Sequence, residues 1–232
     1  MGDYSETGVT SQGRVDIASR VAFFDLDRTV LSINSGSAWV RSERRGGHIT
    51  AGQLLKALWW ISRYKLGWAE LEGPLLQAIR ALEGTEERAM EERVARFFQE
   101  IEPTVRASAL RAIEAHQARG EACVLITTSS IYLARHFGLK LGLDEVLATR
   151  FEVERGWFTG RPEGELCYGE GKVKLATEYA QRQGAELERC YFYSDSYSDL
   201  PLLKAVGSPS VVTPDRKLRG EALRRGWPIL SW

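Results

Sequence analysis

The sequence lacks the marks of a secreted, disulfide-rich or membrane-spanning protein. Its 232 residues include only three cysteines, an odd number, and Cys123 and Cys190 lie inside apolar runs. We therefore expect no disulfide framework and a reducing environment. No apolar run approaches the roughly 20 residues that cross a membrane, and the polar residues 1–20 lack the apolar stretch of a signal peptide. These absences predict a cytoplasmic protein.

An excess of either charge is also absent. Lysine and arginine together number 31, and so do aspartate and glutamate. A chain with this balance exerts no strong long-range attraction on nucleic acid or on anionic lipid, so we expect neither as a partner. The three histidines, His48, His116 and His136, lack the spacing of metal ligands, which argues against zinc. Any anion must be bound by a local group of charges.

Three apolar segments followed by polar residues predict buried strands. They span residues 21–25, 122–127 and 190–194. Helical periodicity lies between and after them, at 105–118, 131–141, 172–182 and 200–205. Strands that alternate with helices predict an α/β protein with a mostly parallel sheet, in a Rossmann-like core of three layers, α/β/α. The segments 146–151 and 157–159 predict a hairpin around Arg155-Gly156.

The long stretch between the first two strands has helical patterning and no strand signal. Its helices are predicted at 54–64, 71–82 and 86–98. We therefore predict an all-helical cap at 33–102, inserted into a core formed by 20–32 and 103–232, with residues 1–19 as a loose tail. The aromatic and basic segment 54–68 suits either the cap interior or a membrane surface, and aromatics at helical spacing favour the interior.

Two carboxylates follow the first predicted strand. Asp25 and Asp27 lie two positions apart in the segment Asp25-Leu-Asp-Arg-Thr29. One carboxylate can attack phosphorus as a nucleophile, while the other protonates the leaving oxygen and then activates water. Taken alone, the pair is equally consistent with a capped turn.

The other two strands are also followed by polar side chains. Thr127 and Thr128 are typical of a phosphate site at a helix N-terminus, although the same residues suit a helix cap. Asp195 and Asp199 follow the third strand, and Asp25 with Asp195 meets the need of Mg²⁺ for one or two carboxylates. Asp199 also suits the N-cap of the helix that follows it. Because ligands bind beyond the carboxyl ends of parallel strands, these groups predict a site.

Lys172 begins a predicted helix after a glycine-rich turn. Its ammonium group can stabilise the charge on a transferring phosphoryl group, although a lysine at such a position is often solvated. The segment is not a P-loop, because Leu166 stands at the first glycine position and Val173 at the hydroxyl position.

The order of these motifs along the chain resembles that of the haloacid-dehalogenase-like superfamily: an acid pair, a hydroxyl, a lysine and a second acid pair. The likeness extends from about Val21 to the C-terminus and is to the phosphoserine-phosphatase-like branch, which has a helical cap after the first strand. It implies a Mg²⁺-dependent phosphatase that hydrolyses a small phosphorylated metabolite through an aspartyl-phosphate. It also implies that Asp25 would be the nucleophile and a metal ligand, and that Asp27 would be the general acid/base and would bind the metal through its carbonyl. Phosphate would be bound by Thr127, Thr128 and Lys172. The metal would also be bound by Asp195, and Asp199 would support the metal and the lysine.

One departure from the resemblance concerns the substrate. Phosphoserine phosphatases usually carry a glutamate shortly after the first motif, whereas this chain has Ser-Ile-Asn-Ser-Gly at 32–36. The departure argues against phosphoserine and leaves Ser35 and Ser37 as candidate substrate contacts. The sequence names neither the substrate nor the oligomeric state.

Three alternatives share the same motifs. A phosphotransferase would use the same phosphoenzyme with another acceptor than water. A catalytically silent phosphoryl-binding regulatory module would keep the fold without turnover, but the presence of both Asp27 and Asp199 argues against it. A response regulator also has an acceptor aspartate on a parallel sheet, and the long helical insertion argues against that class.

Overall fold

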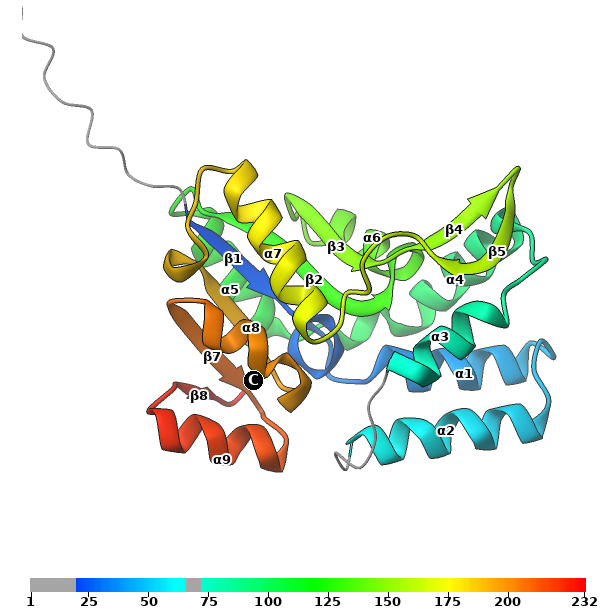
Figure 1. Cartoon of the computed structure of the whole chain (residues 1–232). Coiled ribbons are helices and arrows are strands. Elements are labelled where there is room, and N and C mark those ends of the chain that lie inside the picture. Colours follow the sequence, from blue (N-terminus) through cyan, green and yellow to red (C-terminus); the bar gives the residue numbers. More distant parts are fainter. Residues whose placement is uncertain (1–19, 66–71) are drawn as a thin grey trace, which may run out of the picture.

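The computed structural model describes residues 20–65 and 72–232 and is built around a six-stranded sheet (Figure 1). The strand order is β3-β2-β1-β6-β7-β8, and every neighbouring pair is parallel. The strands are β1 Val21–Phe24, β2 Ala122–Ser130, β3 Glu145–Thr149, β6 Tyr191–Ser194, β7 Ser208–Val212 and β8 Ile229–Leu230. The predicted parallel α/β fold is confirmed, and the predicted tail at 1–19 lies outside the described residues.

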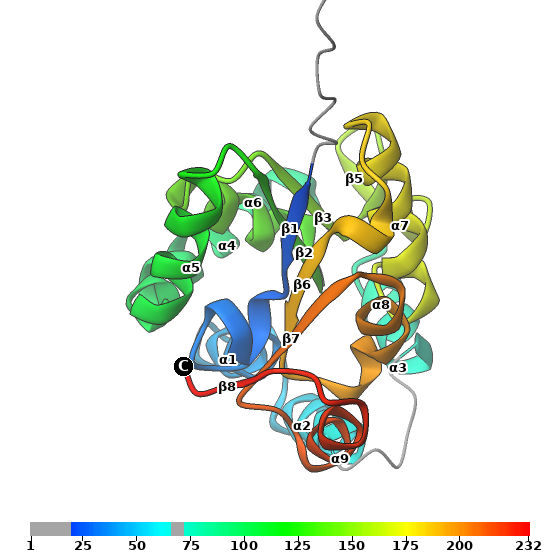
Figure 2. The same ribbon diagram turned by 90° about the vertical axis from the view of Figure 1, so that its left-hand side faces the viewer.

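Helices cover both faces of the sheet, as Figure 2 shows. Strand β1 is buried at every position, and its side chains alternate between two cores: Ala22 and Phe24 enter one, Val21 and Phe23 the other. This burial on both sides is typical of parallel sheets. Helices α5 (Ala107–Gln117) and α6 (Ile131–Lys140) contribute to the first core, and α7 (Glu170–Arg182) and α8 (Leu200–Ala205) to the second. The result is a three-layer core.

The register of the central strands brings their carboxyl ends to one edge. Phe24 of β1 pairs with Leu125 of β2 and with Tyr193 of β6. Asp25 follows Phe24 directly, so it lies level with Ser194, the last residue of β6, and with Ile126 in the middle of β2. This edge is where parallel α/β sheets bind ligands.

A helical cap is inserted between β1 and α5. Its helices are α1 Ser35–Arg45, α2 Ala51–Lys65, α3 Glu72–Arg80 and α4 Glu87–Ile101. Helix α4 buries Met90, Val94, Phe97 and Ile101, a helical spacing, and packs against α6, while α1 contacts both α2 and α4. Figure 1 shows α1 to α3 beside the turn that follows β1. The start of the predicted helix at Leu71 lies outside the described residues.

The predicted hairpin is wrong in its first strand. Strand β3 is an edge strand of the main sheet, parallel to β2, and the hairpin is formed instead by β4 (Phe151–Glu154) and β5 (Trp157–Pro162). The run from 145 to 154 looks continuous in sequence, but strand pattern does not specify a pairing partner. The hairpin contacts the cap, because β5 packs against α3 and Trp157 bridges to Glu86.

The prediction that the aromatic segment of α2 fills the cap interior is wrong for two side chains. Leu55 is 68% exposed and Trp59 is 53% exposed. They lie one helical turn apart, so they share the outer face of α2. The side chains of residues 60–68 lie outside the described part. Within the described ranges, no helix is long and apolar enough to cross a membrane.

Candidate active site

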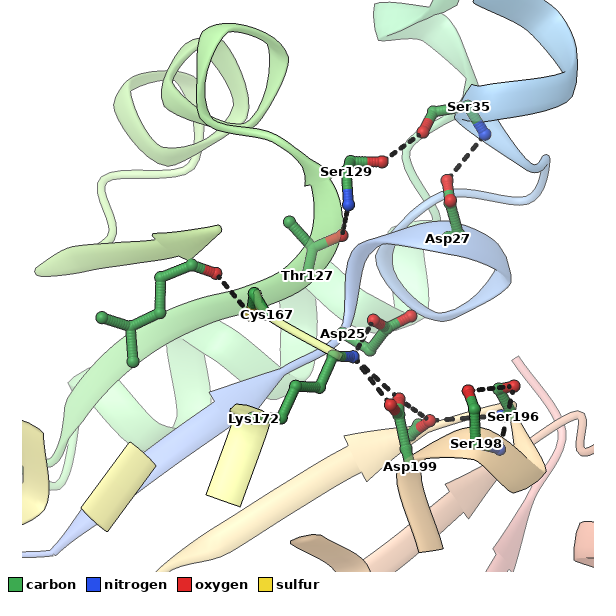
Figure 3. A network of polar contacts seen from close by, with 12 residues as sticks. Asp25, Asp27, Ser35, Thr127, Ser129, Cys167, Lys172, Ser196, Ser198 and Asp199 are labelled. Atoms are coloured by element: carbon green, nitrogen blue, oxygen red, sulfur yellow. Dashed lines mark hydrogen bonds and ion pairs between the residues drawn. The ribbon is translucent and has the colours of Figure 1, made fainter. Parts of the chain in front are cut away.

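The turn after β1 separates the two acids of the first motif. The Asp25 N–H donates to the Tyr193 carbonyl at 2.9 Å, which continues the strand pairing. The chain then forms an irregular turn over Leu26–Val30, in which Asp27 and Arg28 have non-helical backbone angles and Arg28 has φ 59°. A positive φ is rare for a residue other than glycine, and such strained positions gather at functional sites. The turn directs the Asp25 and Asp27 side chains toward different partners, as Figure 3 shows.

Lys172 lies between two carboxylates at the centre of the site. Its Nζ donates to Asp25 Oδ1 at 2.8 Å and to the Asp199 carboxylate at 2.9 Å (Figure 3). Ser194 Oγ donates to the same Asp199 carboxylate at 2.6 Å. Lys172 is only 1% exposed, which excludes the solvated alternative. Asp199 occupies the N-cap position of α8, but its carboxylate makes no capping bond there.

The site perturbs the protonation of its members. Burial raises the pKa of Asp25, and the Lys172 charge only partly opposes this effect. Burial alone would lower the pKa of Lys172, but the Asp199 and Asp25 carboxylates raise it above its usual value. The ammonium group therefore stays protonated and holds Asp25 in place.

Asp195 is a buried carboxylate without a protein partner. It is 6% exposed, and no described residue donates a hydrogen bond to its side chain. Burial raises its pKa well above the usual value, and the nearby Asp25 and Asp199 charges add to the effect, while Arg28 opposes it. A buried charge of this kind is costly unless it is paired or ligates a metal. A bound cation would offset the charge of Asp195 in its ionised form.

The charges of the site fit a divalent cation. Four carboxylates interact here, Asp25, Asp27, Asp195 and Asp199, and the main opposing charges among the described residues are Lys172 and Arg28, so these six groups carry a formal charge of −2. Within the described residues, no three His, Cys, Asp or Glu side chains form a metal cluster. The predicted Mg²⁺ set needs only two carboxylates and a backbone carbonyl, with water and substrate completing the shell. The donor set matches that ion.

Asp27 is held by the first turn of the cap. Its Oδ1 accepts a hydrogen bond from the Ser35 N–H at 2.6 Å, and its Oδ2 accepts from Asn34 Nδ2 at 3.1 Å. The Ser35 hydroxyl lies 2.8 Å from that of Ser129. Helix α1 thus begins beside the edge of the sheet where the carboxyl ends of the strands lie.

The hydroxyl group of Thr127 faces the same edge. Thr127 is 1% exposed, and its Oγ1 accepts from the Ser129 N–H at 3.1 Å, so its own O–H remains available to a phosphate oxygen. Thr128, predicted to lie at a helix N-terminus, is still part of strand β2, and the helix begins three residues later, at Ile131. Strand β2 continues through a register shift to Ser130, which caps α6 by accepting from the Leu133 N–H.

Comparison with known proteins identifies the family to which this chain belongs. The family described as haloacid dehalogenase-like hydrolase matches residues 22–204. The chain belongs to this family. It is therefore a hydrolase, and the resemblance to the phosphoserine-phosphatase-like branch is confirmed.

Three curated relatives of this hydrolase cover most of the chain. A Streptomyces azureus protein named for inhibition of morphological differentiation is 37% identical over 91% of this chain and 78% of its own length. A phosphoserine phosphatase of Mycobacterium tuberculosis is 33% identical over 96% of this chain and 73% of its own. A histidinol-phosphatase of Neisseria meningitidis is 28% identical over 91% and 98%.

Solved structures share the fold. A Bordetella pertussis protein of unknown function has a TM-score of 0.80 and 29% identity, covering 92% of this chain and 98% of that one. A substrate-bound phosphoserine phosphatase has a TM-score of 0.72 and 20% identity, covering 91% and 92%. The second likeness is at the level of fold.

The sequence predicted two contacts near the site differently from the structure and gave no role to two further residues, Asn34 and Ser194. Ser37 was a candidate substrate contact, but both its N–H and its hydroxyl donate to Asn34 Oδ1, and the Ser35 hydroxyl is likewise bonded within the protein. Asn34 and Ser194 were not singled out, although each contacts a predicted acid. An asparagine just before a helix is a recognised N-cap signal, which would have drawn attention to Asn34. Ser194 carries no such signal.

Proposed function

We propose that this hydrolase is a Mg²⁺-dependent phosphatase that cleaves a phosphate monoester of a small metabolite through an aspartyl-phosphate on Asp25. The observation that carries the proposal is the buried Asp25 carboxylate, held by Lys172 near the Asp195 carboxylate, to which no described residue donates a hydrogen bond. Two of the relatives described above are named as phosphatases, which supports the same reaction class. Their named substrates differ, so the proposal extends to a small phosphate monoester and no further.

The first half of the reaction forms a bond from an Asp25 carboxylate oxygen to phosphorus as the bond to the ester oxygen breaks. Asp27 gives a proton to that leaving oxygen, so the alcohol departs neutral. Lys172 and the Thr127 hydroxyl would hold phosphate oxygens at the strand edge. Bound Mg²⁺, held by Asp25, Asp195 and the Asp27 carbonyl, would offset the negative charge between nucleophile and phosphate.

The second half hydrolyses the phosphoenzyme. Asp27, now deprotonated, takes a proton from a water molecule as its oxygen attacks phosphorus. The bond between phosphorus and the Asp25 oxygen breaks, inorganic phosphate leaves, and both aspartates return to their starting states. Ionised Asp25 and protonated Asp27 are therefore needed together at the start.

Replacing the nucleophile tests the proposal. Asp25→Asn keeps the size of the side chain but cannot attack phosphorus, so we expect hydrolysis of 4-nitrophenyl phosphate to fall by several orders of magnitude. Rapid acid quench of the wild-type enzyme with a radiolabelled phosphate ester should trap covalent label, and the variant should trap none. Near wild-type turnover by a folded Asp25→Asn protein would refute the nucleophile assignment.

A further inference from the structure

The start of the cap contacts the acid that protonates the leaving group in the proposed reaction. Asn34 Nδ2 donates to Asp27 Oδ2 at 3.1 Å, and the neighbouring Ser35 N–H donates to Asp27 Oδ1 at 2.6 Å. Both oxygens of Asp27 are thus held by the first residues of α1. These two donors restrict the rotation of the carboxylate about its side-chain bonds.

The Asn34 side chain is oriented by a second set of bonds. Its Oδ1 accepts from the Ser37 N–H at 2.9 Å and from the Ser37 hydroxyl at 2.7 Å, so Asn34 is also the N-cap of α1. The amide oxygen of Asn34 therefore accepts from two donors and its amide nitrogen donates to a carboxylate, so each end of the amide has a partner of the required kind. One side chain therefore caps the helix and donates to Asp27.

We propose that Asn34 is a positioning residue that orients Asp27 for protonation of the leaving group and makes this orientation depend on docking of α1. The inference rests on the proposed function, because it assigns no role to Asn34 unless Asp27 is the general acid. The contact between the Ser35 and Ser129 hydroxyls, at 2.8 Å, fixes the same turn of α1 to the end of β2. Movement of the cap away from the sheet would release Asp27 and disable the acid.

The dependence of rate on the leaving group separates this role from a structural one. Phenyl phosphate and 4-nitrophenyl phosphate have similar shapes, but phenolate is the more basic leaving group and needs the acid more. Damage to general acid catalysis therefore slows phenyl phosphate selectively. A general loss of packing would slow both esters alike. The kcat/KM value is the suitable measure because it reports the steps up to the first irreversible one.

Two substitutions at Asn34 separate capping from donation to Asp27. Asn34→Ser keeps an N-cap oxygen, since serine caps helices about as well as asparagine, but its side chain is too short to reach Asp27. Asn34→Asp also keeps a capping oxygen, and it replaces the donor by a second negative charge. Thr50→Ala is the matched control, because the Thr50 hydroxyl accepts from the Gln53 N–H at 3.2 Å at the start of α2, without contact to Asp27.

For both Asn34 variants, we expect kcat/KM on phenyl phosphate to fall about tenfold to a hundredfold, with a clearly smaller loss on 4-nitrophenyl phosphate. Thr50→Ala should leave the ratio of the two kcat/KM values unchanged. Equal losses on both esters, or no loss in either Asn34 variant, would overturn the role of Asn34. The Asp27→Asn variant, measured in parallel, distinguishes failure of the Asn34 role from failure of the proposed function. If Asp27→Asn also hydrolyses phenyl phosphate normally, Asp27 is not the general acid.

Discussion

Lys172 is a charged side chain held almost entirely out of water. At 1% exposure, its ammonium group is tolerated because the Asp25 and Asp199 carboxylates accept its hydrogen bonds. Removing one member of a buried ion pair costs about 3–5 kcal/mol, because the other charge is left uncompensated. The position of Asp25, the proposed nucleophile, and the stability of the fold are therefore linked through this one lysine.

A second buried ionisable residue, His116, lies away from the site and predicts an acid-sensitive stability. It is 2% exposed and contacts Glu121, Arg119, Tyr193 and Tyr191. Burial lowers its pKa below the usual 6.5, and the hydrogen bond with Glu121 opposes this only in part. The unfolded chain therefore binds the proton more readily, and stability is lost as pH falls below about 6.5.

We expect the free energy of unfolding to fall between pH 7.5 and 5.5 by about 1 kcal/mol more in the wild type than in His116→Gln. Urea denaturation at each pH, in saturating Mg²⁺, measures the difference. The pKa of Glu121 is itself lowered from 4.5, so that residue titrates below this window. Parallel pH profiles for the two proteins would show that His116 does not control the acid sensitivity.

At the scale of an element, the start of α7 determines where Lys172 lies. A Cβ atom on Gly171 would come within 2.0 Å of the Leu166 carbonyl oxygen, so the helix can approach this loop only with glycine there. Gly220 in α9 (Arg216–Arg225) offers a matched control, because nothing lies within 4 Å of its added Cβ. Both glycines lie within a helix, Gly171 in the first turn of α7 and Gly220 in the middle of α9, and they differ in the space available to a side chain.

We expect Gly171→Ala to lower the free energy of unfolding by roughly 1–3 kcal/mol, because the added methyl displaces backbone, and to lower kcat/KM by moving Lys172. Gly220→Ala should leave kcat/KM unchanged and stabilise α9 by up to about 1 kcal/mol. Urea denaturation and steady-state kinetics on both variants provide the comparison. Wild-type kinetics in Gly171→Ala would show that this close approach does not position Lys172.

The sequence predicted the strands that have a clear hydrophobic pattern, but it did not predict a helix that lacks one. Strands β1, β2 and β6 were predicted within a few residues because each is an apolar run ended by polar residues. Helix α9 was not predicted, because it is mostly charged and buries only Leu218 and Ala222. Its end signals were nevertheless present: Asp215 caps it, and Gly226 ends it at φ 69°.

At the scale of the whole molecule, a neutral chain concentrates negative charge at one edge of its sheet. The net formal charge is +0, yet four carboxylates face two cations at the site. An ion that binds this cluster only in the folded state must stabilise the whole chain. Stability should therefore report metal binding independently of turnover.

We expect Mg²⁺ at a hundred times its dissociation constant to raise the free energy of unfolding by about 2.7 kcal/mol and the melting temperature by roughly 5–10 °C. EDTA should reverse this increase and abolish phosphate release, and added Mg²⁺ should restore both. Asp195→Asn should show little of the thermal shift, because it removes one of the two proposed carboxylate ligands. The same shift in that variant would place the ion elsewhere.

The sequence by itself determined the α/β class, the inserted helical cap and the order of acid, hydroxyl, lysine and acid motifs. These features can be recognised locally, because hydrophobic periodicity and motif spacing depend on residues that are close together in the sequence. Only the tertiary structure decided which strand β3 joins, that Lys172 is buried, and that Asn34 reaches Asp27. Lys172 and Asp25 are 147 positions apart, and their 2.8 Å contact depends on sheet register and helix packing, which no single segment specifies.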